Sequence, residues 1–218
     1  EQIKLYAAKR ERTPLSKYVV LPNGVELPAP VERPAAAVSD VVRIGIVASL
    51  TPVKRHDVLL EAWARLEQEM APGRAELVVI GDGPEKHRLE TQAAELGIAS
   101  RVQFVGAVTD VGHRLDGLDI GVLCSDREGL SNAILEYMAH GLPVVATAVG
   151  GTPELIGPEN GLLVPPGDPA AMADALRQIV DEPSRRRAMG DAAASRIRAT
   201  YSWERSIGDL MACYDSVV

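Results

Sequence analysis

Short apolar runs rich in β-branched residues alternate with segments of helical periodicity along most of this chain. The run VRIGIVASL at residues 42–50 comes first, and a helical pattern at 57–70 follows it. Further runs of this kind lie at residues 76–80, 102–105, 120–123, 143–147 and 161–164. Strands that alternate with helices form βαβ units, whose right-handed crossovers build a parallel sheet. The sequence therefore predicts an α/β fold with a Rossmann-like, doubly wound parallel sheet of about six strands.

Helical patterns fill the intervals between the expected strands. They lie at residues 84–96, around 111–117, and at 131–140, 152–156 and 169–180. In the short helix at 152–156, Thr152 is expected to be the N-cap and Pro153 the first helical residue. Two more helices, near 183–200 and 203–217, are expected to follow the sheet as a helical C-terminal extension.

The first part of the chain has a different composition. Residues 1–12 can be helical, and residues 17–21 predict a short strand closed by a Pro-Asn-Gly turn. Residues 27–37 carry three prolines and several alanines, a composition typical of a linker. The predicted division of the chain is a leading segment at 1–40, a compact domain at 41–200 and a last helix at 201–218.

The charge balance restricts the partners that this chain can bind. Its 23 basic and 30 acidic residues give a net charge of −7, whereas nucleic-acid binding usually needs a basic face. Cys124 and Cys213 lie far apart without metal-site spacing, so we expect a reducing cytosol and no zinc site. No apolar run reaches the ~20 residues that a membrane span needs. Because the chain begins at Glu1 without a signal peptide, we expect it to be part of a longer cytoplasmic protein.

The helix after the fourth strand of the domain carries one informative charge, Glu136. Parallel sheets bind ligands at the carboxyl ends of their strands, and this helix follows such an end. Its other residues are apolar, so we expect it to be buried all round. A buried carboxylate needs a partner. That partner is either a core Arg or Lys, or two vicinal hydroxyls such as those of a ribose.

Glu128 lies eight positions before Glu136, in the loop that precedes the helix. Between the two glutamates, the backbone amides of Gly129, Leu130 and Ser131 open the helix. Such amides, together with the helix dipole, favour sugar hydroxyls and phosphate oxygens. Gly129 also allows close approach of a ligand to the backbone. The segment is therefore a candidate site for sugar and phosphate groups.

The Glu-x7-Glu pair, in the context EGLSNAILEYMAHGLPVVAT, resembles the signature of glycosyltransferase family 4. That family comprises retaining enzymes of the two-domain GT-B architecture. The resemblance runs from about residue 18 to the C-terminus and includes VLPNGVEL, GDGPEKHRLE, VQFVGAV, VGGTPELI, GLLVPPGD and YSWE. It implies that this chain is the C-terminal, nucleotide-sugar-binding half of a GT-B enzyme.

The resemblance implies a role for each residue around the glutamate pair. Glu136 would bind the ribose hydroxyls of a nucleoside diphosphate. Glu128 and the three amides that follow it would bind the donor sugar. Ser131 and Asn132, at the start of the helix, would lie beside the diphosphate.

Residues after other strands complete the donor site that the resemblance implies. Gly81 and Gly83 would lie near the nucleotide, and the backbone around Val105 would meet the base. The family commonly needs no divalent metal, because Lys and Arg neutralise the leaving diphosphate. The acceptor hydroxyl would then attack on the face from which the diphosphate leaves.

Lys54 falls where the family places a diphosphate lysine. A lysine there would stabilise the charge that grows on the leaving group; the alternative is a solvated charge at the start of a helix. The family often has Gly-Arg where this chain has Ala48-Ser49, so an expected arginine is missing. Arg55 is the candidate to replace it. We expect Lys54 and Glu128 to be catalytic and Arg55 to bind the donor.

The resemblance implies a hexosyltransferase that uses a UDP- or GDP-hexose and a lipid-linked or polysaccharide acceptor. The acceptor pocket would belong to an N-terminal domain, to which residues 1–21 would contribute the last helix and strand. The last helix of the chain would cross to that domain, and these 218 residues alone would be inactive. The full protein could bind the inner face of the membrane peripherally. The run Arg185-Arg186-Arg187 is either a solvated helix face or part of such a membrane contact.

Two other functions stay open. The first is a nucleotide-sugar-binding module that has lost catalysis, which Ser49 motivates. The second is a GT-B sugar-nucleotide epimerase, which the EGLSN-type loop disfavours.

Overall fold

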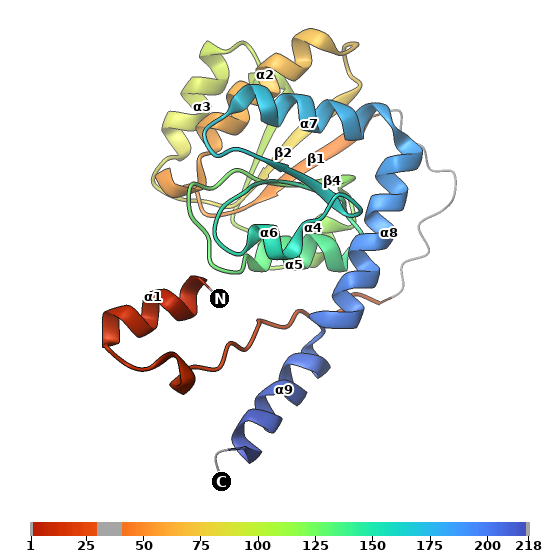
Figure 1. The fold of residues 1–218 in the computed structure, drawn as a ribbon. Coiled ribbons are helices and arrows are strands. Elements are labelled where there is room, and N and C mark those ends of the chain that lie inside the picture. Colours follow the sequence, from red (N-terminus) through yellow and green to blue (C-terminus); the bar gives the residue numbers. More distant parts are fainter. Residues whose placement is uncertain (1, 30–40, 217–218) are drawn as a thin grey trace.

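The computed structural model describes residues 2–29 and 41–216, which contain one six-stranded sheet (Figure 1). The strands are β1 Val42–Val47, β2 Ala75–Ile80, β3 Val102–Gly106, β4 Ile120–Leu123, β5 Val144–Thr147 and β6 Gly161–Val164. Their order is β3-β2-β1-β4-β5-β6, and each neighbouring pair is parallel. The winding reverses between β1 and β4. The predicted doubly wound parallel sheet is confirmed.

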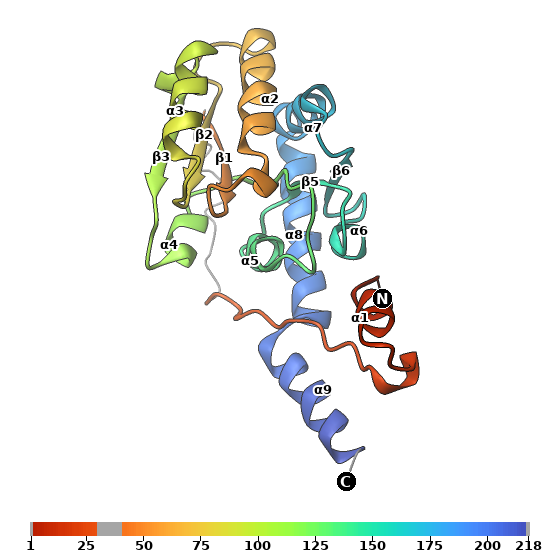
Figure 2. The same cartoon turned by 90° about the vertical axis from the view of Figure 1, so that its left-hand side faces the viewer.

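Helices cover both faces of the sheet, as Figures 1 and 2 show. Residues of α2, α3 and α7 form one apolar cluster with the sheet, and residues of α4, α5, α6 and α8 form a second cluster on the opposite face. The helices are α1 Gln2–Glu11, α2 His56–Glu69, α3 Lys86–Glu95, α4 Val111–Leu115, α5 Asn132–Ala139, α6 Thr152–Leu155, α7 Pro169–Asp181, α8 Pro183–Thr200 and α9 Trp203–Asp215.

The strands are apolar on both faces because both faces are covered. In β2, Leu77 and Val79 join the cluster that contains α2 and α7, whereas Val78 and Ile80 join the cluster that contains α5. Successive side chains of a strand point to opposite faces, which explains this division. It also explains why the sequence shows continuous apolar runs instead of alternation between apolar and polar residues.

Tyr137 fixes α5 against the sheet. Its ring packs on Gly121, where an added Cβ atom would come within 2.5 Å of the ring. The backbone N–H of Val47 donates to the Tyr137 hydroxyl at 2.5 Å, and that hydroxyl lies 3.3 Å from the carbonyl oxygen of Val122, to which it donates. Burial raises the pKa of Tyr137, so the hydroxyl stays protonated. These contacts hold the second half of α5 against β4 and the carboxyl end of β1.

The expectation that the helix containing Glu136, α5, is buried on all sides is wrong. Asn132 is exposed, and Glu136 and His140 are partly exposed, whereas Ile134 and Met138 are buried. Residues four apart lie on one face of a helix, so the first three form an open stripe. An apolar composition alone does not show which stripe the surrounding loops leave uncovered.

The strand predicted at residues 17–21 is also wrong. Leu15–Lys17 form a short 3-10 turn, η1, and the chain then runs without a strand to an isolated bridge between Val25 and Ser202. Val19 and Val20 are exposed. Strand propensity reflects packing on a sheet, and no strand of the described residues pairs with this segment. The linker predicted at 27–37 lies mostly outside the described residues.

Candidate functional site

The loops after β1, β2, β4 and β5 bring the predicted site residues to one edge of the sheet. All strands are parallel, so their carboxyl ends meet at that edge. Backbone hydrogen bonds join the loops. The N–H of Leu50 donates to the carbonyl of Asp82 at 3.0 Å, and the N–H of Asp126 donates to the carbonyl of Val53 at 2.9 Å. The loop after β1 is thus bonded to the loops on both sides.

Lys54 and Glu128 are in direct contact at this edge. Nζ of Lys54 lies 2.6 Å from Oε1 of Glu128, and the hydroxyl of Ser125 donates to the same oxygen at 2.6 Å. The Lys54 side chain is 23% exposed and the Glu128 side chain 10% exposed. Lys54 ends a short 3-10 helix, η2 Pro52–Lys54. The structure therefore excludes the alternative that Lys54 is a solvated charge.

Arg55 has a left-handed backbone, with φ 48° and ψ 42°. Few non-glycine residues adopt this conformation, and it is strained for most of them. The guanidinium donates to the Asp57 carboxylate at 3.1 Å from Nε and to Asp126 at 3.0 Å from Nη1. Hydrogen bonding to Asp57 raises the pKa of Arg55. Two carboxylates of the protein bind this guanidinium, and its expected contact with the donor stays a prediction.

The carboxylate of Glu136 makes no hydrogen bond or ion pair with any other described residue. The alternative of a salt bridge to a core Arg or Lys is therefore not found in this part of the chain. Burial raises the pKa of Glu136, and the nearby His140 opposes that shift. Its carboxylate lies on the open stripe of α5 and can accept hydrogen bonds from a ligand.

The start of α5 presents unpaired hydrogen-bond donors. Within the described residues, the backbone N–H groups of Gly129, Leu130 and Ser131 donate no hydrogen bond. Ser131 is the N-cap, and its side chain does not cap the helix. The side-chain oxygen of Asn132 accepts a hydrogen bond from Nδ2 of Asn23 at 2.8 Å, so its NH₂ end remains a donor. Such a helix start is suited to anionic and hydroxyl oxygens.

Gly81 and Gly83 lie in the loop after β2, where the backbone packs tightly. A Cβ atom on Gly81, which has φ 143°, would clash with the carbonyl oxygen of Ala48, and one on Gly83 would lie 2.5 Å from the carbonyl oxygen of Leu50. Contact between two loops thus requires glycine at both positions. Val105, partly buried at the end of the neighbouring strand β3, packs on the second apolar cluster. The predicted contacts of these three residues with a nucleotide stay predictions.

Gly150 and Gly151 support the backbone that carries Glu128. Gly150 has φ 54°, and a Cβ atom there would clash with the carbonyl oxygen of Glu128. The N–H of Gly151 donates to the carbonyl of Gly129 at 2.9 Å. The prediction that Thr152 caps α6 is wrong: Gly151 is the N-cap, and the buried Thr152 hydroxyl has no partner among the described residues. The chain enters the helix one residue early because the glycine pair lies against the Glu128 loop.

Ser125 and Asn23 are site residues that the sequence did not indicate. Ser125 is fully buried and bonds Glu128 directly. Its signal was its place as the first polar side chain after an apolar strand, just where ligands bind. Asn23 precedes Asn132 by 109 residues, and its Pro-Asn-Gly context indicates only a turn.

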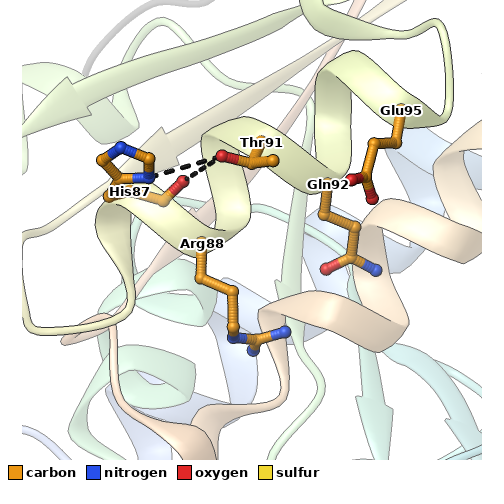
Figure 3. A pocket seen from close by; sticks show the side chains of 5 residues that line it. All are labelled: His87, Arg88, Thr91, Gln92 and Glu95. Carbon is orange, nitrogen blue, oxygen red and sulfur yellow. Dashed lines mark hydrogen bonds between the residues drawn. The ribbon is translucent and has the colours of Figure 1, made fainter.

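A shallow surface hollow lies elsewhere, on α3 (Figure 3). It is lined by His87, Arg88, Thr91, Gln92 and Glu95, and it includes no predicted site residue. The Thr91 hydroxyl donates to the carbonyl oxygen of His87 one turn earlier, at 2.9 Å. All five lining residues belong to α3, and Nε2 of Gln92 donates to the carbonyl oxygen of Asp57 in α2 at 3.3 Å. The lining includes one arginine and no lysine, so it does not bring several cations together for a diphosphate.

Residues 2–29 and 41–216 contain neither a membrane-spanning helix nor a side-chain cluster that could hold a metal ion. No helix there is both long and apolar enough to span a membrane. No three His, Cys, Asp or Glu side chains within residues 2–29 and 41–216 are grouped to hold a metal ion.

A family model described as glycosyl transferases group 1 matches residues 41–182. The chain is 34% identical over 226 aligned residues to D-inositol 3-phosphate glycosyltransferase of Geodermatophilus obscurus, and the match covers 96% of this chain and 48% of that protein. It is 32% identical over 164 residues to a GDP-mannose-dependent monoacylated alpha-(1-6)-phosphatidylinositol monomannoside mannosyltransferase of Corynebacterium glutamicum. That match covers 71% of this chain and 42% of that protein.

Solved structures support the same relationship at the level of the fold. Anabaena HepE in complex with UDP superposes with a TM-score of 0.86 at 22% identity, over 99% of this chain and 62% of that chain. The chain spans about half the length of the curated relatives it matches. With the family model and the relatives in agreement, the chain belongs to the group 1 glycosyl transferases.

Proposed function

We propose that this chain binds a nucleoside-diphosphate hexose at the carboxyl edge of its sheet, as the donor half of a retaining hexosyltransferase. The observation that carries the proposal is the contact of Lys54 with Glu128 beside the unpaired amides of the α5 start. The open carboxylate of Glu136 lies one turn further along that helix. These groups match those of a nucleotide sugar: a cation and N–H donors can bind phosphate, and carboxylates can bind hydroxyls.

Each residue has a separate task in the proposed reaction. Lys54 stabilises the negative charge that develops on the diphosphate as its bond to the sugar breaks. The amides of Gly129 to Ser131 and the side chain of Asn132 bind phosphate and sugar oxygens. Glu128 orients the sugar through its hydroxyls, and Glu136 binds the ribose. We propose no divalent metal, because Lys54 and the helix start supply the positive charge.

The base of the nucleotide is proposed from the names of relatives. One relative is GDP-mannose-dependent, and the HepE structure holds UDP. We therefore propose a UDP- or GDP-hexose as the donor. The backbone around Val105 and the loop of Gly81 and Gly83 would lie beside the base and nucleotide.

We propose that the acceptor site belongs to an N-terminal domain outside these 218 residues. No described residue of α9 is buried, and Trp203, Ile207, Met211 and Tyr214 on this helix are each more than half exposed. Figure 1 shows α9 extending away from the sheet. Contiguous exposed apolar surface usually meets another surface. The full protein would act in the cytoplasm, at the inner face of the membrane, on a lipid-linked or polysaccharide acceptor, and the present chain would bind donor without transfer.

A binding module without catalysis is the second candidate. Ser49 stands where a diphosphate arginine is expected, and Arg55, the candidate substitute, is bound by Asp57 and Asp126. Lys54 would then be the sole fixed side-chain cation near the diphosphate in the described residues. Transfer by the full-length protein separates a catalyst from such a module.

Thermal unfolding of this chain with UDP, GDP and ADP tests the proposal. A ligand that binds only the folded state raises the unfolding midpoint in proportion to ln(1 + [L]/Kd). We expect UDP or GDP to raise the midpoint, and UDP-glucose or GDP-mannose to raise it with the same base preference. Glu136→Ala should reduce both shifts, because both ligands contain the ribose. No shift with any of these compounds would contradict the proposed function.

A further inference from the structure

The protein itself supplies Lys54 with an anionic partner. Its Nζ lies 2.6 Å from Oε1 of Glu128, and the only other described side chain that bonds this carboxylate is Ser125, also at 2.6 Å. Glu128 is 10% exposed, so few water molecules can replace a lost partner. Neither side chain can therefore move without consequence for the other.

A diphosphate that approaches Lys54 meets a cation whose charge is already balanced. If Lys54 turns to the phosphate, Glu128 keeps only the hydroxyl of Ser125. A largely buried carboxylate that loses its counter-ion is strongly destabilised. If Lys54 stays with Glu128, the diphosphate receives only part of its charge and lies near a carboxylate of the same sign. In both cases free nucleoside diphosphate binds more weakly than Lys54 alone would allow.

A sugar hydroxyl changes this balance. A hydroxyl can donate a hydrogen bond to a carboxylate, so a hexose beside Glu128 supplies the donor that Lys54 withdraws. Free nucleoside diphosphate has no hexose and supplies none. We infer that Glu128 and the diphosphate compete for Lys54, and that this competition lets the site discriminate the nucleotide sugar from the free nucleoside diphosphate. The inference rests on the proposed function, and it implies that loss of the sugar favours release of the nucleotide.

Calorimetric titration of UDP and GDP into this chain tests the competition. Wild type is compared with Glu128→Gln, Lys54→Gln and the double variant. We expect Glu128→Gln to bind the free nucleoside diphosphate about tenfold more tightly, because Lys54 is released. The gain should disappear in the Lys54→Gln background, since the effect acts through Lys54. With UDP-glucose or GDP-mannose, Glu128→Gln should lose the preference of wild type for the sugar-bearing ligand.

Two further variants separate the contact with Lys54 from the charge of Glu128 and from the loss of a carboxylate elsewhere on the protein. Glu128→Asp keeps the negative charge but withdraws the carboxylate from Lys54. It should therefore also raise the affinity for free nucleoside diphosphate, by less than Glu128→Gln does. Glu76→Gln removes an exposed carboxylate at the first residues of the strands, the opposite edge of the sheet, where Glu76 pairs with Arg43. That control should change affinity less than about twofold.

The outcomes separate the inference from the proposed function. Wild type that binds none of these nucleotides overturns the proposed function. If wild type binds a nucleotide and both Glu128→Gln and Glu128→Asp bind the free nucleoside diphosphate no more tightly than wild type does, the competition is overturned and the proposed function stands. The competition is also overturned if Glu128→Gln tightens binding of the nucleoside diphosphate equally in wild type and in the Lys54→Gln background. Simple repulsion between Glu128 and the diphosphate would explain that result.

Discussion

Nη1 of Arg55 lies 3.0 and 3.2 Å from the two carboxylate oxygens of Asp126, and this pair joins the loop after β1 to the loop after β4. The backbone bond from Asp126 to Val53 joins the same two loops. Between them, the carbonyl of Lys54 accepts a hydrogen bond from Sγ of Cys124 at 3.0 Å. The position of Lys54 opposite Glu128 is therefore set by contacts of residues on both sides of it.

The backbone of Arg55 provides a test of strain at this junction. Arg55→Ala and Arg55→Gly both remove the ion pairs, but only glycine relieves the left-handed conformation at φ 48°. We expect the glycine variant to be about 1 kcal/mol more stable than the alanine variant. Urea unfolding of the two variants measures the difference. An alanine variant as stable as the glycine variant would show that this backbone carries no strain.

Glu136 should contribute to binding at the expense of stability. Burial raises its pKa above the usual carboxyl range, so the folded state holds the proton more tightly than the unfolded state does. The charged form therefore destabilises the fold at neutral pH. Glu136→Gln should raise the thermal midpoint at pH 7. The gain should shrink as pH falls through the raised pKa and vanish below the usual carboxyl value of about 4.3.

Melting curves of wild type and Glu136→Gln across that pH range test this prediction. Glu76→Gln, at an exposed and ion-paired site, is the matched control and should show no such gain at pH 7. A lower midpoint for Glu136→Gln at pH 7 would mean that the charged carboxylate has a stabilising partner in the fold.

Gly150 should not tolerate a side chain, because a Cβ atom at this position would clash with the carbonyl oxygen of Glu128. Gly150→Ala must displace the Glu128 loop and also adopt φ 54°, so we expect a loss of at least about 1–2 kcal/mol in unfolding free energy. Nucleotide-sugar affinity should fall with it. Gly208→Ala is the control: it lies in helix α9 with open space around its Cβ position and should be stabilising by about 0.5–1 kcal/mol. Denaturant unfolding compares the two, and equal effects would refute the packing argument.

Most of the fold could be predicted because each strand is a short apolar run that a helix separates from the next. β4 and α8 have the predicted bounds, and β6 does too. The first strand ends at Val47 instead of residue 50. The N–H of Ala48 donates to Ile80, the last residue of β2, but the N–H of Leu50 donates to Asp82, which lies in the loop after β2 where no strand continues. The predicted strand at 17–21 failed because a strand needs a neighbouring strand, which a local pattern does not reveal.

The contacts within the site could be predicted only in part. The resemblance placed Lys54 and Glu128 at one ligand, but 74 residues separate them and no local pattern indicated that they bond each other. The left-handed backbone of Arg55 was equally hidden, since arginine has no preference for it. Its conformation depends on Asp57 and on Asp126, which comes from another loop.

The role of Lys54 at the diphosphate is measured by the affinity of Lys54→Gln for the nucleotide sugar that stabilises wild type. Calorimetric titration of UDP-glucose and GDP-mannose gives this affinity, with Arg88→Ala, in the hollow on α3, as the control. Lys54→Gln should lose about tenfold or more in affinity, because it removes the cation for the diphosphate, while Arg88→Ala should bind like wild type. Unchanged affinity in a folded Lys54→Gln variant would contradict the claim that this edge of the sheet binds the diphosphate.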